Sequence, residues 1–212
     1  MEQTLAGILA AAAAGRFPAE DGGVTLVAQP SERDAGVIAF TAHSVVFVDE
    51  DPGWLRKTLA GVDCDSLAAT MNPRFLAALL DRTGRRHDTT DLLTVAAPLD
   101  GPPPVELREI DEPGHPRVRR ALGRRNDVRV WTTDGGVLVL GRGVAGRWEA
   151  AIEVDPEARQ HGLGTALAIA ARHLVPDRGP IWAQQAAGNA RSVRTFQAAG
   201  YRPVGAEALM IR

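Results

Sequence analysis

A glycine-bearing turn between two runs of different character has the composition of an anion-binding loop. A β-prone apolar run, residues 148–154, precedes the turn, and an Ala- and Leu-rich helical run, residues 165–174, follows it. Glycines let the backbone come close to a ligand, and the free amides of a helix's first turn point at a bound anion. Consecutive turn amides can form a nest around the same charge. The pattern Arg159-x-x-Gly162-x-Gly164 therefore predicts a site that holds phosphate.

Two other phosphate loops have patterns that this turn does not match. A dinucleotide-binding fingerprint needs a third glycine where the chain has Leu167, and an acidic residue about 20 positions on, where it reads Ala183-Gln184-Gln185. A P-loop ends in Gly-Lys-Ser/Thr, and the only lysine, Lys57, lies far away. A plain glycine-rich turn is the remaining alternative, which the loop by itself leaves open.

A second block follows at residues 188–201, after a β-prone run at residues 181–187. Asn189 has a side chain that suits a helix N-cap, and Gly200 suits the left-handed residue that ends a helix. Val193, Phe196 and Gln197 fall at helical spacing, so we expect Phe196 to face inward. The block therefore predicts a strand, a capped helix and a glycine stop in that order.

Together the two blocks resemble the GNAT superfamily of N-acyltransferases over about residues 150–205. The first block matches the family's acyl-CoA pyrophosphate pattern, Gln/Arg-x-x-Gly-x-Gly/Ala. The second matches the pattern Asn-x-x-Ser/Ala-x-x-x-Tyr/Phe-x-x-x-Gly-Phe/Tyr. The resemblance implies an α/β (α+β) fold with a mixed, mostly antiparallel sheet flanked by helices. It also implies acetyl transfer from acetyl-CoA, the cosubstrate, to a primary amine by direct attack, without a covalent enzyme intermediate.

The resemblance assigns the acetyl-CoA contacts by position. Backbone amides of residues 160–165 would hold the pyrophosphate, and the backbone of Ile152 and Val154 would pair with the pantetheine arm. An N–H near Ile152 would meet the developing oxyanion. Asn189 would reach the pantetheine or a nearby backbone group, and its role as an N-cap stays equally open. The expected cofactor-binding residues are Ile152, Val154, Arg159, Gln160, His161, Gly162, Leu163, Gly164, Thr165, Asn189, Ser192 and Phe196.

The residues for proton transfer depart from those of many family members. A tyrosine that protonates the leaving thiolate in many members is Phe196 here, and a glutamate that serves some as base is Gln184. We expect the only tyrosine, Tyr201, to pack in the core. Glu149 and Glu153 alternate onto one face of the strand before the loop and are the two candidate bases. An exposed surface carboxylate is the alternative for each, because a base must first lie within reach of the proton.

Two classes of function follow from the resemblance. The first is an active N-acetyltransferase, of EC 2.3.1 type, whose acceptor is a small-molecule or N-terminal amine. The second is a catalytically degenerate GNAT-fold protein that binds acyl-CoA as a sensor or regulatory partner. A protein that binds some other phosphate ligand is a third possibility, because the loop alone predicts only an anion site.

Composition limits the partners. The formal net charge of −2 gives no case for nucleic acid, which usually needs a basic face. The single cysteine, Cys64, excludes an internal disulfide and a Cys-based zinc cluster, and we expect it to be a buried small hydrophobe. The apolar residues 5–14 lack a positive n-region and are too short to span a bilayer, so they predict an amphipathic helix. We expect a cytoplasmic monomer or homodimer with no metal and no membrane partner.

The 212-residue chain has a proline-rich segment at residues 98–104 that suggests a boundary between two domains. Residues 1–98 predict a small α/β domain with an accessory or acceptor-site role, and residues 104–212 predict the GNAT-like catalytic domain. Only one helix fits between the first two strands of the second domain, where the family usually has two. The missing helix normally helps form the wall of the acceptor site, so we expect the first domain to supply that wall. The expected helices are 3–15, one from Pro52, 73–83, 116–124, 165–174 and one after Asn189. The expected strands are 24–29, a β-prone run at 37–48, 92–96, 105–110, a hairpin of 128–132 with 137–141, then 148–154, 181–187 and 206–211.

Overall fold

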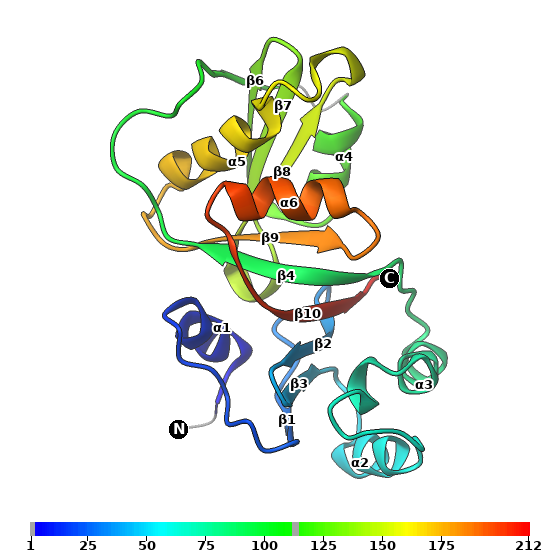
Figure 1. Ribbon diagram of the computed structural model, residues 1–212. Helices are drawn as coiled ribbons and strands as arrows, with labels where there is room; N and C mark the ends of the chain where they lie inside the picture. The colour runs from blue at the N-terminus through cyan, green and yellow to red at the C-terminus, as the bar shows by residue number, and fades with distance from the viewer. Residues whose placement is uncertain (1–2, 112–114) are drawn as a thin grey trace. The chain divides into compact units, whose positions relative to one another are not determined.

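The computed structural model describes residues 3–111 and 115–212, which form two compact units (Figure 1). The first unit is Met1–Leu93 with Val204–Arg212, and the second is Thr94–Pro203. The sequence-based division, 1–98 and 104–212, differs from these units mainly in residues 204–212, which cluster with the first unit.

The first unit combines short strands with helices. Its strand order β1-β3-β2-β10 joins the last strand of the chain to the hairpin of β2 and β3. β1 is parallel to β3, whereas the β3–β2 and β2–β10 pairs are antiparallel. The elements are α1 Leu5–Ala13, β1 Val24–Leu26, β2 Ala35–Phe40, β3 His43–Phe47, α2 Pro52–Ala60, the 3-10 turn η1 Ala69–Met71, α3 Pro73–Thr83, the first half of β4 Thr90–Ala96 and most of β10 Arg202–Met210.

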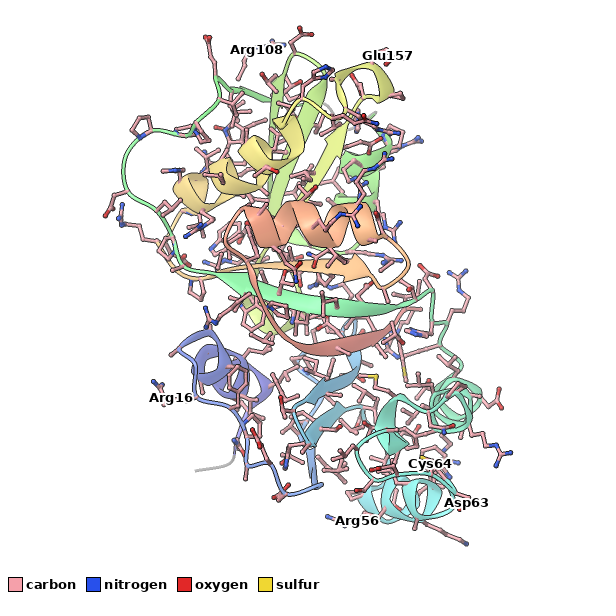
Figure 2. The ribbon with its side chains drawn as sticks, viewed as in Figure 1. Arg16, Arg56, Asp63, Cys64, Arg108 and Glu157 are labelled. Carbon is pink, nitrogen blue, oxygen red and sulfur yellow. The ribbon has the colours of Figure 1, made fainter. Side chains whose placement is uncertain are left out.

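The core of the first unit explains why the last strand belongs to it. One buried cluster contains Phe75 and Leu79 of α3 together with Ala208 and Met210 of β10. The amphipathic face expected for the first helix is also confirmed, because the buried residues of α1 are Leu5, Ile8, Leu9 and Ala12. The expectation that Cys64 is buried is wrong. It lies exposed in the turn after α2, near the surface residue Asp63 (Figure 2).

The second unit holds both sequence blocks. Its strand order is β5-β6-β7-β8-β9, antiparallel except for the parallel pair β8–β9. The elements are β5 Arg108–Ile110, α4 Pro116–Leu122, β6 Asn126–Thr133, β7 Gly136–Arg142, the 3-10 turn η2 Val144–Gly146, β8 Trp148–Val154, the 3-10 turn η3 Pro156–Ala158, α5 Leu163–Leu174, β9 Ile181–Ala186 and α6 Ala190–Ala198. This arrangement confirms the expected α/β fold with a mostly antiparallel sheet flanked by helices.

Helices cover both faces of the sheet in the second unit. On one face, Trp148 and Ala150 of β8 pack with Leu167 of α5 and Phe196 of α6 in a buried apolar cluster. Side chains alternate along a strand, so the neighbouring residues of β8 point to the opposite face. There, Val118 and Ala121 of α4 pack against Val130 and Val139 of the β6–β7 hairpin. The apolar residues therefore recur at helical spacing in the helices and at every second position in the strands, and the sheet lies between two layers of helices.

No helix of the described residues is long and apolar enough to cross a membrane. The same residues contain no group of three or more His, Cys, Asp or Glu side chains that could hold a metal ion.

Candidate functional site

The predicted anion loop forms an open, glycine-bearing entry to α5. After β8 ends, the short turn η3 leads to Gln160 and Gly162, whose φ angles of +69° and +83° lie in the left-handed region. Gly162 occupies the N-cap position of α5, and no side chain of the described residues caps the helix there. The backbone N–H groups of the first turn are therefore available to donate hydrogen bonds to a ligand, as an anion site requires. The loop is exposed from Arg159 to Gly162, and Glu157 of η3 lies at the surface beside it (Figure 2).

Gly164 marks the close approach of α5 to its neighbours. A Cβ atom added there would lie 3.3 Å from Cγ2 of Thr195 in α6 and 3.6 Å from Cγ2 of Val154 in β8. It would also lie 3.9 Å from Cδ1 of Ile152. The glycine thus lets the start of α5 sit against the end of β8 and against α6. Gly162, by contrast, has open space around it, so its backbone conformation accounts for glycine at that position.

The two parallel strands beside this loop pair only at their beginning. β8 pairs with β7 along its whole length. Within the described part of the chain, its register with β9 is limited to Trp148 with Ile181 and Glu149 with Trp182. Residues 150–154 continue past the last of these pairs. The edge of β8 that faces away from β7 is therefore open to an extended ligand, in the way that an added strand binds a sheet edge.

The structure places most of the predicted cofactor residues in one region. Ile152 and Val154 are half-buried at the end of β8, and residues 159–165 form the loop and first turn that follow. Arg159 folds back, and its Nε donates to the carbonyl oxygen of Val154 at 3.0 Å. Leu163, Gly164 and Thr165 belong to α5, which begins two residues earlier than the sequence predicted.

The second block forms the capped helix that its sequence predicted. The Asn189 side chain accepts a hydrogen bond from the backbone N–H of Ser192 at 3.1 Å, which confirms the N-cap. Asn189 is exposed and Ser192 is half-buried. Phe196 is buried and faces inward as expected, with its ring edge-on to Tyr201 at a centroid distance of 4.9 Å. Direct contact of these residues with a cofactor stays a prediction.

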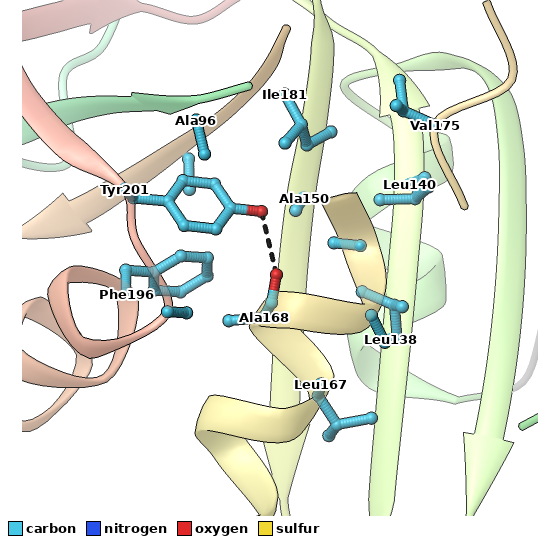
Figure 3. Close-up of a cluster of buried hydrophobic side chains, with 14 of the residues drawn as sticks. Ala96, Leu138, Leu140, Ala150, Leu167, Ala168, Val175, Ile181, Phe196 and Tyr201 are labelled. Atoms are coloured by element: carbon cyan, nitrogen blue, oxygen red, sulfur yellow. Dashed lines mark hydrogen bonds between the residues drawn. The ribbon is translucent and has the colours of Figure 1, made fainter. Parts of the chain in front are cut away.

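Tyr201 is a core residue, as expected (Figure 3). It is 2% exposed, and its hydroxyl donates a hydrogen bond of 3.2 Å to the carbonyl oxygen of Ala168 in α5. Burial raises the pKa of the phenol well above its usual value, and the nearby Arg172 lowers it by less. A phenol with this pKa and a backbone partner does not serve as a ready proton donor for a thiolate.

Glu149 is enclosed by partners that sequence analysis missed. It is 4% exposed, and its carboxylate accepts hydrogen bonds from Arg125, Arg147 and Gln184. Burial alone would raise the pKa of Glu149, but Arg147, Arg125 and the bond from Gln184 lower it to about 2. Such a carboxylate is a poor proton acceptor near neutral pH, so its environment argues against the expected role as general base. The only sequence signal for these partners is the pair Gly141 and Gly143, because a side chain at either position would collide with Arg125 or with Glu149.

Glu153 lies on the same strand face and remains accessible. Its side chain is 42% exposed, and Oε2 is 3.1 Å from Nε of Arg117 in α4. This single ion pair at the surface is weaker than a buried one, because solvent screens it. Of the two carboxylates predicted as bases, only Glu153 has a side chain that a bound substrate or water could reach.

Comparison with known proteins supports the second unit's assignment. Residues 128–201 match the sequence model described as the acetyltransferase (GNAT) family. No curated protein matches the chain significantly.

Similar solved structures include two GCN5-related N-acetyltransferases. The one from Kribbella flavida is 17% identical over 64% of this chain and 63% of that chain, with a TM-score of 0.41. The one from Sphaerobacter thermophilus is 15% identical over 65% of this chain and 56% of that chain, with a TM-score of 0.39. The chain thus spans less than two thirds of either structure, and these low scores add nothing to the family match. That match includes the glycine loop, the Asn189 cap and Tyr201, and the segment of the second unit that holds both blocks therefore belongs to the GNAT acetyltransferase family.

Proposed function

We propose that the protein is an N-acetyltransferase that moves an acetyl group from acetyl-CoA to a primary amine. The observation that carries this proposal is the uncapped, glycine-bearing start of α5 beside the free end of β8. The family match supports acyl transfer in general. The acceptor would be a small-molecule or N-terminal amine in the cytoplasm.

The geometry suggests how each part of acetyl-CoA would bind. The pyrophosphate would lie against the amides of residues 160–165, where the helix dipole favours negative charge. The pantetheine amides would pair with the backbone of β8 at Ile152 and Val154. The thioester would then lie farther along β8, toward the point where β8 and β9 separate. A backbone N–H near Ile152 is the proposed donor to the developing oxyanion.

The reaction would be a direct displacement. The amine nitrogen forms a bond to the thioester carbonyl carbon, and the bond from that carbon to sulfur breaks. A proton leaves the attacking nitrogen, and the departing thiolate takes one up. Glu153 is the proposed acceptor of the first proton, directly or through water, because its carboxylate is accessible. Since Phe196 replaces the usual tyrosine and Tyr201 is buried, solvent would supply the second proton. Holding both reactants together would provide much of the rate.

Thermal scans test whether the site binds CoA. Acetyl-CoA or CoA at 100 times its dissociation constant should add about 2.7 kcal/mol of apparent stability, whereas NAD and ATP should add less. No shift with either CoA species, or a larger shift with NAD, would contradict the proposal. An acceptor panel with detection of the released thiol then tests for transfer to amines.

A second candidate, an acyl-CoA sensor without catalysis, is favoured by one observation. Neither residue position that could carry a phenol offers one to the site, because position 196 is a phenylalanine and Tyr201 bonds to Ala168. A sensor would give the thermal shift with acetyl-CoA and no thiol release with any amine. Turnover with an amine would exclude it.

A further inference from the structure

The buried cluster around Glu149 joins four segments of the second unit. The carboxylate accepts from Nε of Arg125 at 2.9 Å and from Nε of Arg147 at 2.9 Å. It also accepts from Nε2 of Gln184 in β9 at 2.8 Å and from the backbone N–H of Val144 in η2 at 3.3 Å. Glu149 thereby connects its own strand to the β6 entry, the β7–β8 turn and β9.

Two glycines, Gly141 of β7 and Gly143 just after that strand, make room for this cluster. A Cβ atom at Gly141 would lie 2.9 Å from Cβ of Arg125, and Gly141 is the register partner of Glu149. A Cβ atom at Gly143 would collide with the Glu149 carboxylate itself. Alternating glycines thus leave a space on one sheet face that the buried ions fill.

The cluster lies where β8 and β9 separate. Glu149 and Trp182 form the last register pair of these strands, and Gln184 reaches back to Glu149 from two residues farther along β9. Arg147 adds a second link, because its guanidinium carbon lies 5.3 Å from the centroid of the Trp182 ring. Side chains therefore tie the two strands together at the last point where their backbones pair.

We propose that Glu149, with Arg125, Arg147 and Gln184, is a positioning clamp that fixes the separation of β8 and β9. The clamp holds the free edge of residues 150–154 in the geometry that accepts the pantetheine arm. This inference rests on the proposed function for its ligand. It assigns Glu149 a positioning role in place of the proton transfer that its sequence position suggested.

The arrangement favours positioning over proton transfer. A base must give up its negative charge to receive a proton, and here that would leave the buried Arg147 and the largely buried Arg125 without their counter-charge. Removing one member of a buried pair is costly because an uncompensated charge remains. A clamp uses the same contacts without breaking them.

The variant Gln184→Leu tests the clamp without removing a charge. It deletes the side-chain bond between β9 and Glu149 and leaves both Arg–Glu pairs in place. We expect the dissociation constant for CoA and the KM for acetyl-CoA to rise tenfold or more. The pH dependence of kcat should keep its shape, because no titrating group is lost. Gln197→Leu, the same substitution at an exposed residue of α6, is the matched control and should leave both constants within twofold.

Amide hydrogen exchange provides a readout that does not need CoA. In Gln184→Leu, residues 150–154 should exchange at least tenfold faster than in the wild type, and the β6–β7 hairpin should keep its rates. Unchanged exchange at residues 150–154 overturns the clamp, whether or not the wild type binds CoA. If the wild type binds CoA and Gln184→Leu binds it equally well, the clamp is also wrong, and the proposed function survives. A wild type that binds no CoA defeats the proposed function alone, and the exchange rates then decide the clamp.

Glu149→Gln separates the two roles of this residue. A clamp predicts a large loss of CoA affinity, with the remaining turnover following the wild-type pH profile. A general base predicts unchanged CoA affinity, a loss of kcat and the disappearance of one limb of that profile. The second pattern would show that Glu149 transfers the proton.

Discussion

At the scale of single residues, Glu149 and Glu153 differ in environment although they share one strand face. Glu149 is buried between two arginines, whereas Glu153 is half-exposed and pairs with one. The order of the residues predicted the shared face but not this difference, because Arg125 and Arg147 reach Glu149 only after the strands and turns have formed. Environment, and not residue type, therefore decides which carboxylate can act as a base.

The ion pairs of Glu149 predict a stability effect that depends on pH. Its pKa is lowered from 4.5 to about 2 in the folded protein, so the charged form stabilises the fold above pH 4.5. That contribution is lost as the pH falls from 4.5 toward 2. Glu149→Gln should lower the free energy of unfolding by about 3–5 kcal/mol at pH 7, because it leaves the buried Arg147 and the largely buried Arg125 without their counter-charge. Urea unfolding at pH 7 and pH 2.5 measures the difference in free energy of unfolding between wild type and variant. An equal difference at both pH values would contradict the prediction.

Replacing Tyr201 should change activity little, whereas replacing a catalytic acid would reduce kcat strongly. Tyr201→Phe removes one hydroxyl that donates to the carbonyl oxygen of Ala168. The expected cost in stability is about 1 kcal/mol, the net worth of a typical hydrogen bond, and most of the activity should remain. Steady-state kinetics with acetyl-CoA and a responsive amine measure it. A loss of about a hundredfold or more in kcat, with acetyl-CoA affinity intact, is the size that general acid catalysis supplies and would show that Tyr201 is the acid.

At the scale of elements, the glycine loop and the capped helix were predictable because their signals are local. The left-handed φ of Gly162, the Asn189 cap and the inward ring of Phe196 follow from neighbouring residues alone. The exact start of α5 was not predictable, since helix ends depend on how the first turn packs. The close approach at Gly164 could not be predicted either, because Thr195 lies in α6, beyond β9 in the chain, and meets Gly164 only in the folded protein.

The loop predicts a charge effect that one pair of substitutions isolates. Gly162→Asp and Gly162→Asn add side chains of nearly equal size at the same left-handed position, which has open space around it. Asparagine tolerates this conformation, and only aspartate opposes the pyrophosphate charge. Gly162→Asp should therefore weaken CoA binding at least tenfold more than Gly162→Asn does. Isothermal titration at low salt measures both, with circular dichroism as the control for folding. Equal affinities of the two variants would move the pyrophosphate to another site.

At the scale of the whole molecule, sequence order places the chain's last strand in the second domain, whereas the structure groups it with the first unit. The proline-rich segment suggested that everything after it forms one domain, but residues 204–212 cluster with the first unit. Strand pairing between distant segments decides this, since β10 is antiparallel to β2. Nothing local in residues 206–211 specifies that partner, because a half-buried apolar strand fits any sheet edge.

Met210 tests that membership directly. It is 1% exposed and packs in the cluster that contains Phe75 and Leu79 of α3. Met210→Ala should cost about 2–5 kcal/mol, because it removes a buried methylene, the sulfur and the terminal methyl group and leaves a cavity. The loss should appear first in the first unit, so amide exchange in α3 should accelerate more than exchange in α5. Leu167→Ala, which truncates a buried side chain of α5, is the matched control and should reverse the order. If Met210→Ala instead accelerates exchange in α5 ahead of α3, the last strand stabilises the second unit and the sequence-based division is the better one.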